Sequence, residues 1–115
     1  MLDGPLVFVD IDTQRDFLDP DGALYVPGSN AIVPNLARLT RFAREHGIPV
    51  IASSDAHTLD EPDPEPFPPH CLVNTPGHER VAATAWPTSR IVAVGESFSD
   101  TEPPPHLTIH KQRYD

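Results

Sequence analysis

Hydrophobic residues gather in four short runs along the chain, and their patterns predict four strands. Leu6–Ile11 is an apolar run interrupted only by Asp10, which is typical of a central parallel strand covered on both faces. The second run, PVIASS, spans residues 49–54, and the third, RIVAVG, spans residues 90–95. Alternating apolar and polar residues at 107–111 predict the fourth strand.

A helical pattern separates the first two runs. Its apolar residues recur at helical spacing on one face, and they are Ile32, Val33, Leu36, Leu39, Phe42 and Ala43. Ser29 or Asn30 can cap this helix, Pro34 fits its first turn, and Gly47 ends it. The order strand, helix, strand predicts a right-handed βαβ unit and therefore an α/β fold with a mainly parallel sheet.

Loops dominate the second half of the chain. Proline accounts for 15 of the 115 residues, and five of them fall within residues 62–69. Residues 56–78 are therefore expected to form one long loop, followed by a short, weak helix at 79–85. Because long loops in compact domains are uncommon and usually functional, this segment is a candidate for binding or catalysis.

Length and charge narrow the classes of function. A chain of 115 residues forms at most one domain. Its formal net charge of −9 argues against nucleic acid and anionic membranes as partners, since both require a cationic surface. A single cysteine excludes an internal disulfide, and the sequence has neither a membrane-length apolar run nor a signal-peptide pattern. We therefore expect a cytoplasmic protein.

Three ionisable residues follow or end predicted strands: Asp12, Asp55 and Lys111. Ligands of open α/β sheets bind outside the carboxyl ends of the strands, so we expect these three side chains at one edge of the sheet. Asp12 beside Lys111 forms either a structural ion pair or a general base held next to a cation. The residue types alone leave both interpretations open.

Asp55, His57 and His70 are candidate metal ligands. Two imidazoles and a carboxylate suit Zn²⁺, Fe²⁺ or Mn²⁺, and three protein ligands leave positions open for water or substrate. A solvated loop with scattered histidines is the alternative. Cys71 directly follows His70, and neighbouring side chains of an extended segment point to opposite sides, so we expect Cys71 to be packed and inert rather than nucleophilic.

Four segments together resemble one family, the isochorismatase-like cysteine hydrolases, and within it the nicotinamidases. They are FVDIDTQRDFLDPDGALYVPGS at 8–29, GIPVIASSDAH at 47–57, FPPHCLVNTPG at 67–77 and HKQRYD at 110–115. The motifs D-x-Q-x-D-F, D-x-H, H-C-x-x-x-T-x-G and K-x-x-Y-D are specific in combination, and they spread over nearly the whole chain. The resemblance implies the N-terminal part of a doubly wound, mainly parallel sheet with flanking helices.

The resemblance also implies site residues. Asp12 corresponds to the catalytic base and Lys111 to the catalytic lysine, while Phe17 would line the substrate pocket. Asp55, His57 and His70 would hold a divalent metal, with Zn²⁺ favoured over Fe²⁺ or Mn²⁺. Asp10, Gln14 and Asp16 are expected to support Asp12 through hydrogen bonds.

The implied reaction is hydrolysis of nicotinamide, or a similar small amide such as pyrazinamide, to the acid and ammonia, in NAD salvage. The metal would orient the pyridine ring, and a cysteine activated by Asp12 would attack the carboxamide to form a thioester. Backbone N–H groups would stabilise the oxyanion. The implied partners are this small amide and either a second copy of the chain or a complementing C-terminal polypeptide.

In the family, the nucleophilic cysteine follows the lysine by several tens of residues. We therefore expect residues 1–115 to be a single, C-terminally incomplete isochorismatase-like domain, inactive alone, whose first strand is exposed as a sheet edge. A truncated product, a split gene and an incomplete record all fit this expectation. The alternative functions are a non-catalytic metal-binding or interaction module and one piece of a split cysteine hydrolase.

Overall fold

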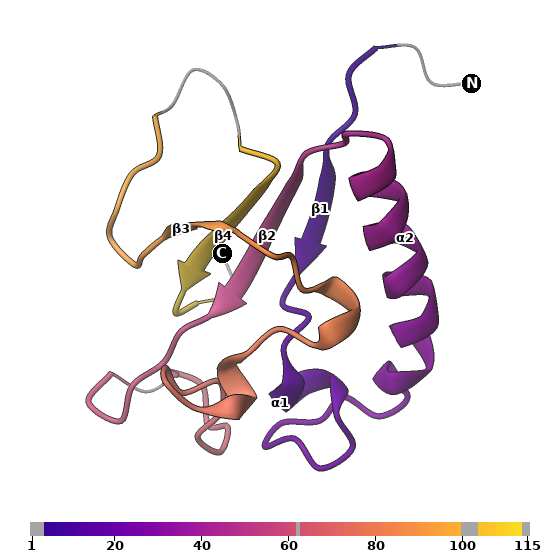
Figure 1. Ribbon diagram of the computed structural model, residues 1–115. Coiled ribbons are helices and arrows are strands. Elements are labelled where there is room, and N and C mark those ends of the chain that lie inside the picture. The colour runs from indigo at the N-terminus through magenta and orange to yellow at the C-terminus, as the bar shows by residue number, and fades with distance from the viewer. Residues whose placement is uncertain (1–3, 62, 100–103, 114–115) are drawn as a thin grey trace.

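A parallel β-sheet forms the centre of the computed structural model, which describes residues 4–61, 63–99 and 104–113 (Figure 1). Within these residues four strands are arranged in the order β1-β2-β4-β3, and every neighbouring pair is parallel. The strands are β1 (Phe8–Ile11), β2 (Val50–Asp55), β3 (Arg90–Val92) and β4 (His106–Lys111). The predicted α/β class and the parallel βαβ unit are confirmed.

The helix α2 (Val33–Glu45) makes the crossover between β1 and β2. Gly47 ends it with a φ of 65°, a conformation that favours glycine, so the predicted helix end is confirmed. The predicted cap is wrong, because a 3₁₀ turn, η1 (Ser29–Ile32), precedes the helix. The Ser29 hydroxyl donates to the Phe17 carbonyl instead, and Asn30 accepts from the Tyr25 hydroxyl.

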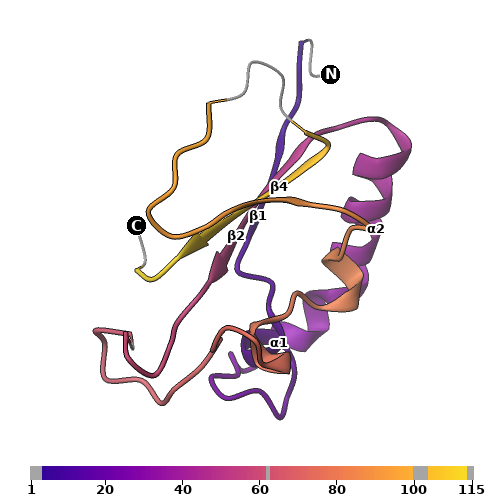
Figure 2. The ribbon, with the colours of Figure 1, turned by 60° about the vertical axis from the view of Figure 1, so that its left-hand side comes forward.

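A small core joins α2 to the sheet. Ala43, Ile48 and Val50 form a buried cluster, and Phe8 and Trp86 pack against it. Apart from Trp86, these residues come from α2, its following turn and both flanking strands, so burial of apolar surface fixes the crossover on this face of the sheet. Figure 2 shows α2 along this face.

The opposite face of β1 is open. Val9 is 67% exposed and Ile11 68% exposed, whereas Phe8 and Asp10 on the other face are half-buried. β1 is also an edge strand, because β2 is its only neighbour within the described residues. The apolar run does not mark a strand covered on both faces in this chain. The expectation that the first strand is an exposed edge is confirmed.

Between β2 and β3 the chain has little regular structure. The prediction of a helix at residues 79–85 is wrong, because only a 3₁₀ turn, η3 (Ala82–Thr84), forms there. Another 3₁₀ turn, η2 (Pro76–His78), precedes it. A one-turn helix, α1 (Arg15–Leu18), follows β1 and was not predicted. The helices of the described ranges are too short or too polar to cross a bilayer.

Candidate functional site

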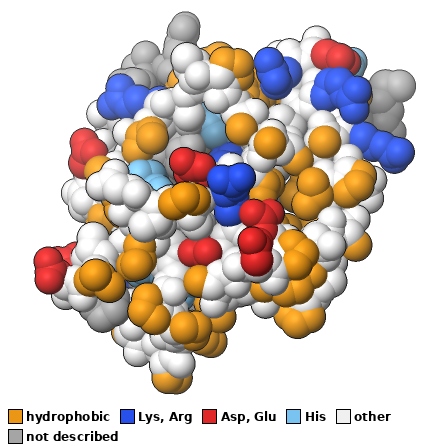
Figure 3. All heavy atoms as spheres, turned by 60° about the horizontal axis from the view of Figure 1, so that its bottom comes forward, with side chains coloured by type: hydrophobic (Ala, Val, Ile, Leu, Met, Phe, Trp, Pro, Cys, Tyr) orange, Lys and Arg blue, Asp and Glu red, His pale blue; other side chains and the backbone are white. Residues whose placement is uncertain are grey.

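The ends of β1, β2 and β4 bring together three charged side chains. Lys111 Nζ lies 3.0 Å from Asp12 Oδ2 and 2.6 Å from Asp55 Oδ1. Lys111 and Asp55 are direct partners in the parallel register, while Asp12 directly follows β1. Figure 3 views this end of the sheet, where acidic, basic and histidine side chains meet among hydrophobic ones. The expected location at one sheet edge is therefore confirmed.

The Lys111 ammonium is shared by two carboxylates. Burial alone would lower the pKa of Lys111, but the hydrogen bonds to Asp55 and Asp12 outweigh it and raise the pKa above its usual value. Asp12 also accepts a hydrogen bond of 2.7 Å from the Ser53 hydroxyl, a contact that the sequence did not indicate. Asp12 has a φ of 55°, which is unusual for a residue other than glycine and turns the chain out of the strand at this point.

Beside this group, the imidazoles of His57 and His70 meet a carboxylate. Asp55 Oδ2 lies 3.6 Å from His57 Nε2 and 3.7 Å from His70 Nε2. Potential ligand atoms of the three residues all lie within 4.8 Å of one another, and all three residues are buried. Their convergence agrees with the motif spacing.

The protonation pattern of these histidines suits a metal ion. His70 Nδ1 lies 2.8 Å from the Pro68 carbonyl, which can only accept, so Nδ1 donates and Nε2 of the neutral ring has a free lone pair. His57 is 2% exposed, and neither of its ring nitrogens has a hydrogen-bond partner among the residues that the structure describes. A buried nitrogen without a partner is costly, and a metal ion would satisfy it. Asp55, His57 and His70 thus fit a divalent metal.

Gln14 fixes the backbone at the end of β2. Its side chain is fully buried, accepts from Asp55 N at 2.8 Å and donates to the carbonyls of Asp55 and His78. Asp16 fixes the loop after the second histidine, since its carboxylate accepts from Cys71 N at 2.7 Å and Ala23 N at 3.0 Å.

The expectation that Asp10, Gln14 and Asp16 hydrogen-bond to Asp12 is wrong. The chain turns at Asp12 into α1, so Gln14 and Asp16 face the loop backbone, as described above. Asp10 lies two residues earlier on the α2 face of the sheet and pairs with Arg80 at 2.9 Å. Arg80 is not among the predicted site residues, although an acidic residue inside an apolar run indicates a buried cationic partner.

The buried guanidinium of Arg80 connects several segments. It also donates to Thr13 Oγ1 at 3.0 Å and Ser54 Oγ at 2.9 Å. Burial raises the pKa of Asp10 despite the opposing charge of Arg80. Arg80 therefore joins the loop after η2 to β1 and β2, two of the three strands that carry the site.

Cys71, the single cysteine, has no exposed surface. Burial, together with the negative charges of Asp55 and Asp16, raises the pKa of its thiol far above the usual value. The prediction of a packed cysteine is confirmed, but its reason is wrong: Cys71 has a φ of 48°, so the segment is not extended. Such a thiol is a poor nucleophile.

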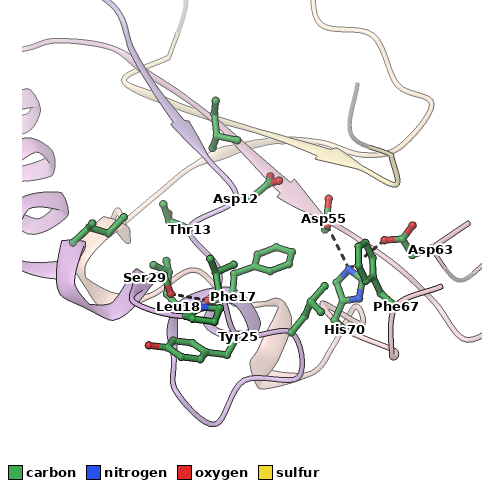
Figure 4. Close-up of a pocket in the computed structure, with 15 residues that line it drawn as sticks. Asp12, Thr13, Phe17, Leu18, Tyr25, Ser29, Asp55, Asp63, Phe67 and His70 are labelled. Carbon is green, nitrogen blue, oxygen red and sulfur yellow. Dashed lines mark hydrogen bonds and ion pairs between the residues drawn. The ribbon is translucent and has the colours of Figure 1, made fainter. Parts of the chain in front are cut away.

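A cavity of about 520 Å³ lies over these groups (Figure 4). Asp12, Asp55 and His70 form its polar end, while Phe17 and Phe67 are among its mainly apolar walls. The ring centroid of Phe17 lies 5.6 Å from that of His70, and Phe67 meets the same imidazole edge-on at 6.2 Å. The cavity has the mixed character of a pocket for a small ligand.

Asp63 also lines this cavity, and sequence analysis did not single it out. Its position between two prolines of the long loop, in P-D-P, was the available signal.

Tyr114 and Asp115, which end the K-x-x-Y-D motif, lie outside the described residues.

Residues 6–114 match the isochorismatase domain family. Among curated relatives, a probable inactive nicotinamidase of Arabidopsis thaliana is 38% identical over 60 residues, which is 52% of this chain and 31% of that protein. Nicotinamidase 1 of the same plant is 38% identical over 55 residues, 48% of this chain and 22% of that protein. The aligned segments thus span less than a third of the length of these two relatives.

Among solved structures, the zinc complex of the pyrazinamidase of Pyrococcus horikoshii has a TM-score of 0.66 at 29% identity. The similarity covers 93% of this chain and 51% of that one. The parallel sheet and its helical crossover therefore match the fold of this protein, and the chain spans about half of its length.

Proposed function

This chain belongs to the isochorismatase domain family, and from that premise we propose that it carries the metal-binding and proton-transfer part of a nicotinamidase-type active site. The reaction is hydrolysis of a small aromatic amide, nicotinamide in the first instance, to the acid and ammonia. The observation that carries this proposal is the convergence of Asp12, Lys111 and the Asp55, His57 and His70 cluster on one cavity. The resemblance of this chain to the family motifs suggests a role for each of these residues.

In this proposal Asp12 is the general base. Its Oδ1 is held by the Ser53 hydroxyl and its Oδ2 by Lys111, so the carboxylate is oriented before substrate binds. The ammonium of Lys111 lies against the Asp12 carboxylate, which in this proposal accepts a proton from an attacking thiol. Phe17 lines the cavity and would pack against the aromatic ring of the amide.

Asp55, His57 and His70 would hold the divalent ion, and Zn²⁺ is the first choice among several metals that suit these ligands. When bound, the metal supplies a Lewis acid that fixes the ring nitrogen of the amide. Gln14 holds the backbone of Asp55 in place, and the Pro68 carbonyl fixes the tautomer of His70. The apolar walls exclude water from the ring.

The nucleophile comes from outside residues 1–115 in this proposal. The support is the state of Cys71, which is fully buried and has a raised pKa. The chain is then the N-terminal part of a single isochorismatase-like domain, and the open face of β1 is covered by polypeptide equivalent to the other half of the solved relative. The exposure of the apolar side chains of Val9 and Ile11 supports the proposal that further polypeptide covers this face.

A non-catalytic metal-binding module is the second candidate. The same buried cluster favours it, because a metal ion there would also tie the proline-rich loop to β2 without any nucleophile. This candidate requires neither a base at Asp12 nor an amide in the cavity.

Zinc titration followed by nicotinamide titration separates the two. We expect calorimetry to find one Zn²⁺ per wild-type chain and none in His57→Ala, and ligand-observed NMR to detect nicotinamide binding only to the zinc-loaded chain. Zinc binding without nicotinamide binding would reject the amidohydrolase site in favour of the module. Thr58→Ala, at the exposed neighbouring position, is the control that should bind both.

A further inference from the structure

We propose that Arg80 is a positioning residue of the active site, whose guanidinium holds the turn that presents the Asp12 carboxylate to Lys111 and the cavity. The inference rests on the proposed function, because that function makes Asp12 the general base. It adds a residue that lies outside the four family motifs, and Asp10, the ion-pair partner of Arg80, lies outside them too.

The turn at Asp12 needs support from its surroundings. Asp12 has a φ of 55°, and this left-handed conformation costs free energy in a residue other than glycine. From this turn the carboxylate of Asp12 meets Lys111 Nζ at 3.0 Å. Figure 4 shows Asp12 and Thr13 on the turn, directly after β1. The contacts that hold the residues on both sides of Asp12 therefore set the direction of the base.

The Arg80 guanidinium contacts both sides of this turn. Its Nη1 donates to Asp10 Oδ2 at 2.9 Å, two residues before Asp12, and to Thr13 Oγ1 at 3.0 Å, directly after it. Its Nη2 donates to Ser54 Oγ at 2.9 Å, on β2. The donors of a guanidinium have fixed directions, so one planar group sets the spacing of β1 and β2 beside the base.

Ser53 connects Arg80 to the base through the second strand. Its hydroxyl donates to Asp12 Oδ1 at 2.7 Å. Its carbonyl accepts from Asp12 N at 3.2 Å and from Arg80 Nη2 at 3.4 Å. The residue that orients the Asp12 carboxylate is therefore itself held by the same guanidinium.

The backbone around Arg80 pairs with the residues that follow the turn. Gln14 lies opposite Arg80 in an antiparallel bridge, and Val81 N donates to the Thr13 carbonyl at 3.0 Å. The guanidinium thus extends from a segment that is itself fixed to the turn. The Arg80 side chain is 10% exposed and that of Asp10 14%, so water competes little with these hydrogen bonds.

The test is a double-mutant cycle between Asp12→Asn and Lys111→Met, which measures the coupling of these two side chains by urea unfolding. The cycle is run in the wild-type chain, in a paired replacement of Asp10→Leu with Arg80→Met, and in Arg41→Met, a control that removes an exposed arginine on α2. The paired replacement is needed because Arg80→Met alone leaves the buried Asp10 carboxylate without its cation. Apolar groups in place of a whole buried ion pair often preserve stability.

We expect the coupling in the paired replacement to fall below about half of its wild-type value, and the coupling in Arg41→Met to stay unchanged. Arg80→Lys, which keeps the charge but not the planar fork, should also reduce the coupling, and it carries the test if circular dichroism finds the paired replacement unfolded. A purely structural role of Arg80 would change the stability of the chain and leave the coupling as it is. That result, or the absence of coupling in the wild-type chain, would overturn the inference.

NMR provides a second measurement that does not depend on unfolding. The Cα and Cβ chemical shifts of Asp12 depend on its backbone conformation, so they should move in the paired replacement and stay in place in Arg41→Met. Shifts that stay in place in both backgrounds would also overturn the inference.

These measurements require neither metal nor amide. Unchanged coupling would remove the role of Arg80 and leave the proposed function to the zinc and nicotinamide titrations. Failure of those titrations alone would remove the role of Asp12 as a base, and the measured effect of Arg80 on the turn would stand apart from it.

Discussion

Lys111 Nζ lies 3.0 Å from Asp12 Oδ2, and the same ammonium lies 2.6 Å from Asp55 Oδ1. One cation is thus shared by the carboxylate proposed as a base and by a carboxylate proposed to bind metal. Because the side chain of Lys111 is only 18% exposed, its charge acts on both groups with little screening by water. The two halves of the site are therefore electrostatically coupled.

Replacement of this lysine should destabilise the fold. Lys111→Met leaves two partly buried carboxylates without their shared cation, and we expect a loss of about 2 kcal/mol in the free energy of unfolding at pH 7. Urea unfolding followed by circular dichroism measures it. Arg113→Met, which removes an exposed cation two residues away, is the matched control and should cost less than about 0.5 kcal/mol. Equal losses in the two variants would refute the coupling.

The thiol of Cys71 should be unreactive in the folded chain. Burial and the nearby carboxylates raise its pKa, so a thiol reagent at pH 8 should modify it only at the rate at which the chain unfolds. Modification in denaturant should be immediate.

The chain alone should also release no ammonia from nicotinamide in the presence of Zn²⁺. Ammonia release that Cys71→Ala abolishes would identify this cysteine as the nucleophile and contradict our assignment.

Stability should decrease with acid because of His106. Burial, with a smaller effect of the Arg80 charge, lowers its pKa from 6.5 to about 4. Between these values the unfolded chain binds a proton that the folded chain does not, so the free energy of unfolding falls as the pH falls from 6.5 towards 4. The contribution of this one group is at most about 3 kcal/mol.

The variant His106→Asn should reduce this slope. Trp86 lies 5.1 Å from the His106 ring, so its fluorescence reports unfolding at this position. The quantity to compare is the decrease in the free energy of unfolding from pH 6.5 to pH 4.5. This decrease should be larger for wild type than for the variant. An unchanged difference would mean that His106 does not carry a lowered pKa. His78 and His110, whose pKa values are also lowered by burial, contribute to the remaining slope in the same direction.

The open edge of β1 should promote self-association. Val9 and Ile11 expose apolar side chains on a strand whose one neighbour within the described residues is β2, a combination that favours pairing with another strand. Val9→Lys and Ile11→Lys should shift the chain towards the monomer in light scattering. Leu59→Lys, at a position that is 77% exposed in a loop, is the control for added charge alone. A monomeric wild-type chain with a reversible thermal transition would count against the exposed edge as a hazard.

Much of the fold could be predicted because its signals are local. The apolar runs and the spacing around Leu36 and Phe42 determine the strands and the crossover helix. Residues 79–85 carry weak local signals. A 3₁₀ turn forms there in place of the predicted helix, because contacts with α2 and Thr13 determine the backbone conformation. The predicted cap of α2 is wrong for a similar reason, since the Ser29 hydroxyl donates to the Phe17 carbonyl, a contact with another part of the chain.

For the site, residues that follow strands were predictable, and residues that act through tertiary contacts were not. The placement of Asp12, Asp55 and Lys111 follows from the direction of parallel strands. Arg80 contacts Asp10 across a wide separation in the sequence, and no short-range pattern encodes that contact. Asp63 is close to His70 in the sequence, but the residue types of the loop do not show that the two side chains meet. The prediction that Gln14 and Asp16 support Asp12 rests on their closeness in the sequence. The turn at Asp12, which directs their side chains elsewhere, has no local signal.

A comparison of nicotinamide binding with benzamide binding shows whether the metal site holds the ring of the amide. Benzamide has the same carboxamide and a ring of the same size but lacks the ring nitrogen, so only nicotinamide can reach a metal ion through its ring. We predict that the zinc-loaded chain binds nicotinamide at least about tenfold more tightly than benzamide, and that the metal-free chain does not distinguish them. Equal affinities for the two amides in the zinc-loaded chain would contradict the account.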